Sequence, residues 1–252
     1  MLGAVDSRGR EPAVAERGLR CWRRIQPRPS GRGYCWVITT QANDKKYVSR
    51  AGVKLEHALR EFRVDVTGLV CADFGCNVGG FTDCLLQHGA SEVYAIDTGY
   101  GVLDYRLRTD PRVIVMERTN VLHVLRPEDH PPSEPVGFEG VDLVTIDVGW
   151  TRQQHAVPAA LKWLASGGRI ITLVKPHYEL EGDEKKSWLV DGTLAEERAE
   201  EVLKRVVAQL PQLGVEVLAS TTSPIRGAKS GRKTRGHGNV EYLVWARKIT
   251  TA

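Results

Sequence analysis

The stretch Val70-Cys-Ala-Asp-Phe-Gly-Cys-Asn-Val-Gly-Gly-Phe-Thr-Asp-Cys-Leu-Leu86 decides the fold. Its apolar start predicts a short buried strand, its glycines predict a tight turn, and its end predicts the opening of a helix. The next apolar run, Val93 to Ile96, is closed by Asp97. Glycines let a backbone approach a ligand closely, and a carboxylate roughly 20 residues further along the chain suits ribose hydroxyls. The pattern therefore predicts a site for a nucleoside-bearing cofactor.

Strand-like and helix-like runs alternate through the rest of the chain. We expect strands over residues 70–74, 93–97, 113–116, 141–147, 169–174, 215–219 and 240–246. Helices are expected over residues 80–88, about 154–164 and 193–210, with Gly167-Gly168 ending the second of these. A further helix is expected behind Ser49 as its N-cap, and residues 127–135 read as a loop. This alternation predicts an α/β fold with a mainly parallel seven-stranded sheet and helices on both faces.

Four ionisable residues fall at or near the ends of predicted strands, namely Asp73, Asp97, Asp147 and Lys175. Parallel sheets bind their ligands beyond the carboxyl ends of the strands, so one edge should gather all four. A lysine that loses hydration there could accept a proton from a hydroxyl nucleophile. The simpler alternatives are a turn without a ligand, a carboxylate that caps a helix, and a lysine that reaches out to solvent.

The length of the chain and its cysteines limit the classes of protein to which it can belong. The 252 residues suffice for one α/β domain, expected over residues 46–252, and a basic, flexible arm over residues 1–45. No apolar run approaches the roughly 20 residues of a membrane span, and no secretory signal is evident at the N-terminus. The five cysteines contain no CxxC pair, which argues against a disulfide framework and against a metal site. A reducing cytoplasm is therefore expected.

The net charge of +4 is unevenly distributed. Eight arginines lie in the first 32 residues. A second basic run contains no acid and consists of Arg226, Lys229, Arg232, Lys233 and Arg235. Two basic segments on a nearly neutral body favour a polyanionic partner such as RNA. A solvated tail and a solvated loop would give the same composition.

Seven short motifs follow one another along the chain. They are Tyr47–Leu55, Gly79–Leu86, Glu117–Asn120, Thr145–Val148, Leu173–Pro176, Ser223–Gly227 and Gly238–Glu241. In order and spacing they resemble the TlyA family (the hemolysin A proteins) of FtsJ-like RNA 2′-O-ribose methyltransferases. The glycine turn, Asp-x-Gly-x-x-x-Gly-Gly, likewise resembles the first motif of S-adenosylmethionine-dependent methyltransferases more than it resembles GxGxxG. The resemblance implies a Rossmann-like methyltransferase fold with an antiparallel last strand.

The resemblance also implies a reaction and the residues that carry it. The implied catalytic residues are Lys54, Asp147, Lys175 and Glu241. Lys175 would take the proton of a ribose 2′-hydroxyl, and the oxygen would attack the sulfonium methyl of S-adenosylmethionine. The implied cofactor contacts are Asp73, Gly75, Gly79, Gly80, Phe81, Asp97, Asn120 and Asp147. The implied partner is RNA, most readily ribosomal RNA or a ribosomal subunit.

The chain departs from the family pattern in several places. The first 45 residues do not resemble the S4 RNA-binding domain with which family members usually begin. Gly149-Trp150 stands where Ser-Phe is usual, and His177-Tyr178 stands where Gln-Phe is usual. The basic insert 230–237 could replace part of an RNA-binding surface through phosphate contacts. Alternatives to the RNA methyltransferase are a non-catalytic cofactor- or RNA-binding protein, a membrane-active hemolysin, and a methyltransferase with another acceptor.

Overall fold

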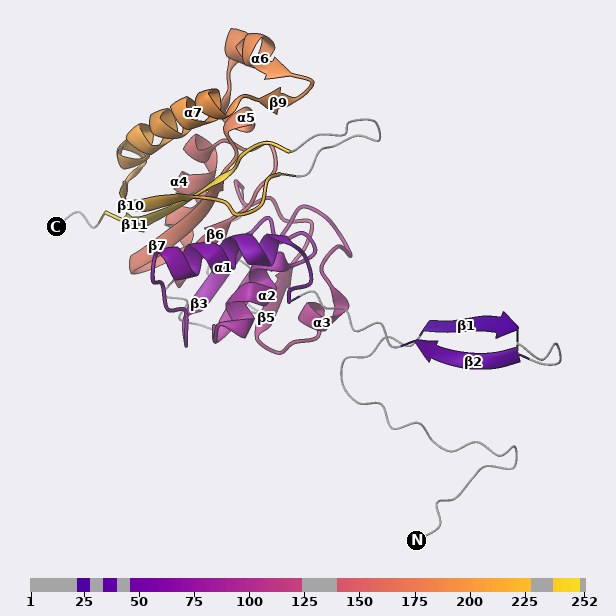
Figure 1. The fold of residues 1–252 in the computed structure, drawn as a ribbon. Helices are drawn as coiled ribbons and strands as arrows, with labels where there is room; N and C mark the ends of the chain where they lie inside the picture. The colour runs from indigo at the N-terminus through magenta and orange to yellow at the C-terminus, as the bar shows by residue number, and fades with distance from the viewer. Residues whose placement is uncertain (1–21, 28–33, 40–45, 124–139, 228–237, 250–252) are drawn as a thin grey trace. The chain divides into compact units, whose positions relative to one another are not determined.

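A computed structural model describes residues 22–27, 34–39, 46–123, 140–227 and 238–249 (Figure 1). The chain divides into two units, Met1–Lys46 and Tyr47–Ala252. In the first unit, strands β1 (Trp22–Pro27) and β2 (Tyr34–Thr39) pair antiparallel. The sequence pattern did not predict this hairpin, and the flexibility of residues 1–45 stays a prediction. The predicted loop at residues 127–135 lies outside the described residues.

The second unit contains a seven-stranded sheet in the order β10-β11-β7-β6-β3-β4-β5. The strands are β3 (Val70–Phe74), β4 (Glu92–Ile96), β5 (Val113–Met116), β6 (Val141–Ile146), β7 (Leu164–Val174), β10 (Val215–Thr222) and β11 (Tyr242–Lys248). Neighbours from β5 through β7 pair parallel, whereas β11 runs antiparallel between β7 and β10. The predicted Rossmann-like α/β fold with an antiparallel last strand is therefore confirmed.

Helices cover both faces of this sheet, as predicted (Figure 1). The larger helices are α1 (Ala51–Glu61), α2 (Gly80–Gln87), α4 (Gln153–Trp163) and α7 (Glu196–Gln209). Short elements are the helices α3 (Tyr105–Arg108), α5 (Pro176–Glu179) and α6 (Gly182–Trp188), the 3-10 helix η2 (Leu210–Leu213), and the paired strands β8 (Leu189–Val190) and β9 (Thr193–Leu194). None of these short elements was anticipated from the sequence.

Two hydrophobic cores result, one on each side of the sheet. Side chains alternate along β3, so Cys71 belongs to the core that includes α1 and α2, while Ala72 and Phe74 belong to the core that includes α4 and α7. Phe74 meets the buried indole of Trp163 edge to face at 5.7 Å between ring centroids. A central strand buried on both faces explains why the sequence reads as a continuous apolar run there.

Several predicted boundaries differ from the structure, and three of these differences show a physical reason. Helix α7 begins at Glu196 because Thr193–Leu194 pair with β8 as a small hairpin. Strand β7 begins directly after α4, so Gly167-Gly168 lie within that strand rather than between helix and strand. Arg50, not Ser49, occupies the N-cap position of α1, although the Ser49 hydroxyl accepts a hydrogen bond from the Ala51 N–H at 3.3 Å.

Candidate active site

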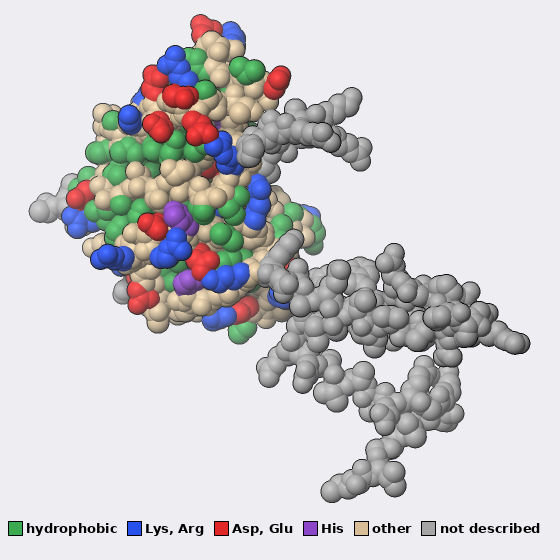
Figure 2. Space-filling view, viewed as in Figure 1, with side chains coloured by type: hydrophobic (Ala, Val, Ile, Leu, Met, Phe, Trp, Pro, Cys, Tyr) green, Lys and Arg blue, Asp and Glu red, His purple; other side chains and the backbone are tan. Residues whose placement is uncertain are grey.

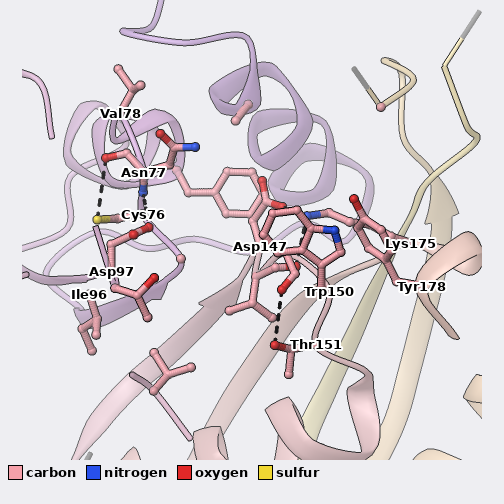
Figure 3. Close-up of a pocket in the computed structure, with 18 of the residues that line it drawn as sticks. Cys76, Asn77, Val78, Ile96, Asp97, Asp147, Trp150, Thr151, Lys175 and Tyr178 are labelled. Carbon is pink, nitrogen blue, oxygen red and sulfur yellow. Dashed lines mark hydrogen bonds and ion pairs between the residues drawn. The ribbon is translucent and has the colours of Figure 1, made fainter. Parts of the chain in front are cut away.

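A cavity of about 650 Å³ opens at the carboxyl ends of β3, β4, β6 and β7 (Figure 3). Its volume lies within the range of about 300–1,000 Å³ typical of small-molecule sites. Eight of the predicted site residues line it, namely Lys54, Gly75, Phe81, Asp97, Asn120, Asp147, Lys175 and Glu241. The topology thus brings together residues that lie almost 190 positions apart, as in the Lys54–Glu241 pair.

The turn after β3 forms one wall of the cavity. Gly75 has φ +84°, and a Cβ at this position would lie 2.8 Å from the Asp147 carbonyl oxygen. Only glycine therefore allows the two strand ends to approach so closely. The backbone N–H of Asn77, at φ +49°, donates to Asp97 Oδ2 at 2.9 Å, and the Gly99 N–H donates to Asp97 Oδ1 at 2.7 Å. Asp97 thus fixes the turn, and each of its oxygens can accept a further hydrogen bond.

Asp73, Gly79 and Gly80 do not line the cavity. Asp73 is completely buried and accepts hydrogen bonds from the N–H and hydroxyl of Thr82 and from the Thr145 hydroxyl, at 2.9, 2.7 and 3.2 Å. Burial raises the pKa of its carboxyl to about 7, against the opposing effect of these hydrogen bonds. The Asp73 carboxylate thus anchors the start of α2, and its contact with a cofactor stays a prediction.

The two glycines shape the same region from behind the cavity wall. Gly79 is the N-cap of α2 in a left-handed conformation, with φ +100°. A Cβ at Gly80 would lie 2.9 Å from the Gly52 nitrogen, at the start of α1. Gly80 is therefore needed for α1 to pack against α2, the helix contact that positions Lys54.

Lys175 and Asp147 form an ion pair within the cavity. The Lys175 ammonium lies 2.6 Å from Asp147 Oδ1, and it also donates to the Val148 carbonyl oxygen at 3.1 Å. The side chains are 14% and 19% exposed, respectively, so the pair is accessible to a ligand. Asp147 follows β6 and Lys175 follows β7, two parallel neighbours in the sheet. Two acceptors thus hold the amine of Lys175 in one orientation.

Lys54 and Glu241 form a second, more deeply buried ion pair. Lys54 Nζ lies 2.5 Å from Glu241 Oε2, and the two side chains are only 7% and 4% exposed. Gly227 lies against this pair, because a Cβ there would be 2.7 Å from Glu241 Oε1. The desolvation cost of a buried ion pair can exceed its electrostatic gain. Stability alone therefore gives little reason for this pair, and a functional role becomes the better explanation.

Aromatic residues form the outer wall beside Lys175. Trp150 is 84% exposed, has φ +57°, and lies 6.4 Å from the Tyr178 ring between centroids. Figure 3 shows both rings next to Asp147 and Lys175. The His177 ring lies 4.1 Å from Tyr178, and burial followed by the charges of Lys175 and Lys185 lowers the pKa of His177 to about 4. The sequence comparison noted Trp150 and Tyr178 only as departures, although an aromatic residue directly after a catalytic motif was an available signal.

The predicted RNA-binding residues are placed only in part. Arg226 forms an ion pair with Glu196, whereas Lys229, Arg232, Lys233 and Arg235 lie outside the described residues. Arg50, which the sequence analysis did not single out, lines the cavity and donates to the Arg226 carbonyl oxygen at 3.2 Å. Figure 2 shows acidic and basic side chains mixed over α6 and α7. In the part of the chain that the structure describes, no helix is long and apolar enough to cross a membrane.

Known proteins show the same combination of fold and motifs. Residues 47–248 match the FtsJ-like methyltransferase family. Hemolysin A from Brachyspira hyodysenteriae is 37% identical over 199 residues, which cover 79% of this chain and 75% of that protein. The 16S/23S rRNA (cytidine-2′-O)-methyltransferase TlyA from Mycobacterium tuberculosis is 36% identical over 211 residues, covering 82% of this chain and 71% of that protein.

Solved structures agree with these matches. A hemolysin-named protein from Streptococcus thermophilus aligns with a TM-score of 0.70 and 35% identity, over 85% of this chain and 71% of that chain. A methyltransferase structure from Listeria monocytogenes aligns with a TM-score of 0.55 and 15% identity, over 79% of this chain and 99% of that chain. At this low identity the similarity shows the fold alone. Taken with the site geometry, these similarities establish that the chain belongs to the FtsJ-like methyltransferase family, together with the hemolysin A (TlyA) proteins.

Proposed function

We propose that this protein transfers a methyl group from S-adenosylmethionine to a ribose 2′-hydroxyl of ribosomal RNA. The observation that carries the proposal is the meeting of two lysine–carboxylate pairs in one cavity, next to the turn held by Asp97. The relative from Mycobacterium tuberculosis is named for methylation of cytidine in 16S and 23S rRNA, so cytidine is the first nucleotide to test. We expect the activity in the cytoplasm, where ribosomal RNA is found.

The wall formed by β3 and β4 fits the proposed cofactor. S-adenosylmethionine, when bound, supplies an electrophilic methyl group on a positively charged sulfur. Asp97 offers carboxylate oxygens of the kind that bind ribose hydroxyls, and Gly75 leaves the backbone open to a close approach. Ile96, Val121 and Leu122 supply apolar lining near Asn120, where a nucleobase would be sheltered.

The wall formed by β6, β7 and β11 fits the proposed chemistry. Lys175, in its neutral form, accepts the proton of the 2′-hydroxyl, while Asp147 and the Val148 carbonyl hold its nitrogen in place. The Lys54 ammonium has hydrogens beyond the one that it donates to Glu241, and these are available to the attacking oxygen. Alignment of the hydroxyl with the methyl group supplies much of the rate.

The outer wall fits a nucleotide that has left its stack. Enzymes and proteins that act on single nucleotides often stack the exposed base on aromatic side chains. Trp150 and Tyr178 present such rings beside Lys175. Arg50, at the cavity edge, supplies a positive charge for a phosphate. An RNA ribose therefore has a base-binding surface and a proton acceptor within one cavity.

The proposal is tested with the full chain, radiolabelled S-adenosylmethionine and rRNA from cells that lack this activity, offered both naked and in assembled subunits. Digestion of the product to nucleosides followed by mass spectrometry should detect a 2′-O-methylated nucleoside. Detection of a base-methylated nucleoside instead would show that the methyl acceptor is a base and not the ribose 2′-hydroxyl. Cofactor binding without methylation of any RNA would favour the non-catalytic alternative.

A further inference from the structure

The two segments that carry the proposed catalytic residues are joined by a buried polar network away from the cavity. One segment links β6 to α4 and carries Asp147 and Trp150. The other follows β7, consists of Lys175 and the short helix α5, and carries Lys175 and Tyr178. Neither segment lies within a strand, so the sheet alone does not fix how the two pairs of side chains meet.

Glu179 connects the second segment to the first. It ends α5, and its Oε1 accepts the backbone N–H of Gln153, the first residue of α4, at 3.0 Å. The N-cap residue of α4, Arg152, provides no side-chain cap. A carboxylate at this position satisfies an otherwise unpaired donor and interacts favourably with the helix dipole. Glu179 therefore caps a helix that begins directly after the Asp147–Trp150 segment.

The side chain of Gln153 makes a second connection, to β7. Its Oε1 accepts the Thr172 hydroxyl at 2.7 Å, and its Nε2 donates to the Leu173 carbonyl oxygen at 3.5 Å. Thr172 and Gln153 are both buried. A buried amide with both ends hydrogen-bonded has few alternative positions, because moving it would leave polar groups unpaired.

None of the three side chains lines the active-site cavity. Gln153 and Glu179 instead line a separate cavity of about 400 Å³ between α4 and α7, together with Arg152, Arg205 and Glu184. They act on the chemistry only through the segments that they join.

We infer that Gln153, Thr172 and Glu179 are positioning residues that hold the Asp147–Trp150 segment against the Lys175–Tyr178 segment, so that the ion pair and the two rings meet a nucleotide together. The inference rests on the proposed function for its catalytic readout. A displacement of about 1 Å at a reacting group lowers a rate by up to about a hundredfold, so a loosened network should affect turnover more than binding.

Substitutions at Glu179 test this role. Burial raises the pKa of the Glu179 carboxyl to about 7, against the hydrogen bond from Gln153 and the charges of Arg152 and Arg205. Glutamine therefore resembles its protonated form and keeps an oxygen that accepts the Gln153 N–H. Glu179→Ala should lower kcat by about tenfold to a hundredfold with little change in KM for RNA or in cofactor affinity, and Glu179→Gln should restore most of the rate.

Thr172 offers a second, independent variant. Thr172→Val removes one hydroxyl at nearly constant volume and should lower kcat in the same way, whereas Thr172→Ser should restore it. The matched control is Asp142→Ala, which also removes a carboxylate that accepts one backbone N–H, from Val70 at 2.9 Å, but at the start of β3. A loss of kcat in the control equal to that in Glu179→Ala would reduce the effect to general destabilisation and overturn the inference.

Hydrogen exchange gives a readout that does not depend on methyl transfer. Peptides covering residues 147–156 and 172–181 should exchange faster in Glu179→Ala than in the wild type. In Glu179→Gln their exchange should return towards the wild-type rate. If the wild type methylates no RNA, the proposed function fails while this measurement still tests the network. Unchanged exchange in Glu179→Ala, or faster exchange with unchanged kcat, would overturn the positioning role.

Discussion

The two halves of the active-site cavity are built in different ways. Between β3 and β4, the wall depends on a backbone turn that is shaped by Gly75 and held by the two hydrogen bonds to Asp97. Beyond β6 and β7, the wall contains two lysine–carboxylate pairs at 2.6 and 2.5 Å, the second of which joins Lys54 of α1 to Glu241, just before β11. The first half therefore depends on turn conformation and the second on charge pairing. Substitutions in the first should affect cofactor binding, and substitutions in the second should affect turnover.

The largest expected effect separates the two halves most clearly. Lys175→Ala removes the proposed proton acceptor and should lower methyl transfer by about 10²–10⁴-fold, the range for general acid–base groups. Calorimetry should find S-adenosylmethionine affinity little changed. Lys162→Ala, on the exposed surface of α4, is the control for loss of a lysine. Substantial turnover by the Lys175 variant would remove it from the mechanism.

Substitutions in the buried Lys54–Glu241 pair test whether these two charges serve catalysis and not stability. Glu241→Leu leaves the Lys54 ammonium buried without its partner, which should lower the free energy of unfolding by about 3–5 kcal/mol. The double variant Lys54→Met with Glu241→Leu should recover most of that stability in urea titrations but none of the activity. Recovered activity in the double variant would contradict a catalytic role for the pair.

Asp97 tests the cofactor half. Asp97→Ala removes the carboxylate that holds the turn and should weaken S-adenosylmethionine binding by about tenfold to a hundredfold, as expected for hydrogen bonds to a charged group. At saturating cofactor, kcat should be nearly that of the wild type. Asp110→Ala is the matched control, because Asp110 also accepts a backbone N–H, from Arg112 at 3.0 Å, on an exposed turn. Unchanged cofactor affinity would refute the ribose assignment.

The last prediction concerns the stability of the fold at Asp73, behind the cofactor half, and no effect on turnover is expected from it. Burial raises the pKa of its carboxyl from 3.8 to about 7. The folded form therefore binds this proton more tightly than the unfolded chain does. The stabilisation is complete below pH 3.8 and is lost as the pH rises towards 7, at up to roughly 1.4 kcal/mol per pH unit. Comparison of urea unfolding at several pH values should find this slope in the wild type and not in Asp73→Asn. Equal slopes would place the Asp73 pKa near its ordinary value.

The two halves also differ in how far sequence alone predicts them. The cofactor half follows from one continuous motif, Val70 to Leu86 with Asp97, because a strand, a turn and a helix are local structures. The catalytic half needed family resemblance, since Lys54 and Glu241 become neighbours only through the order of strands in the sheet. The sequence did not reveal that the Asp73 side chain lies behind the cavity wall, because a carboxylate at a strand end can point either into the cavity or behind it.

Other features lay beyond any local pattern. The Glu179 cap on α4 joins residues 26 positions apart, and no periodicity marks such a contact. The hairpin formed by β8 and β9 interrupted a segment that reads as one amphipathic helix from Thr193. Pairing within a short local hairpin thus prevailed over helix propensity at the start of α7.

The central claim is that the catalytic half faces a ribose of ribosomal RNA. The most direct test maps 2′-O-methylation across all rRNA from cells with the protein, cells without it, and cells carrying only the Lys175→Ala form. The account predicts that at least one ribose methylation disappears without the protein and is restored by the wild type but not by the variant. Identical methylation maps in all three would contradict it.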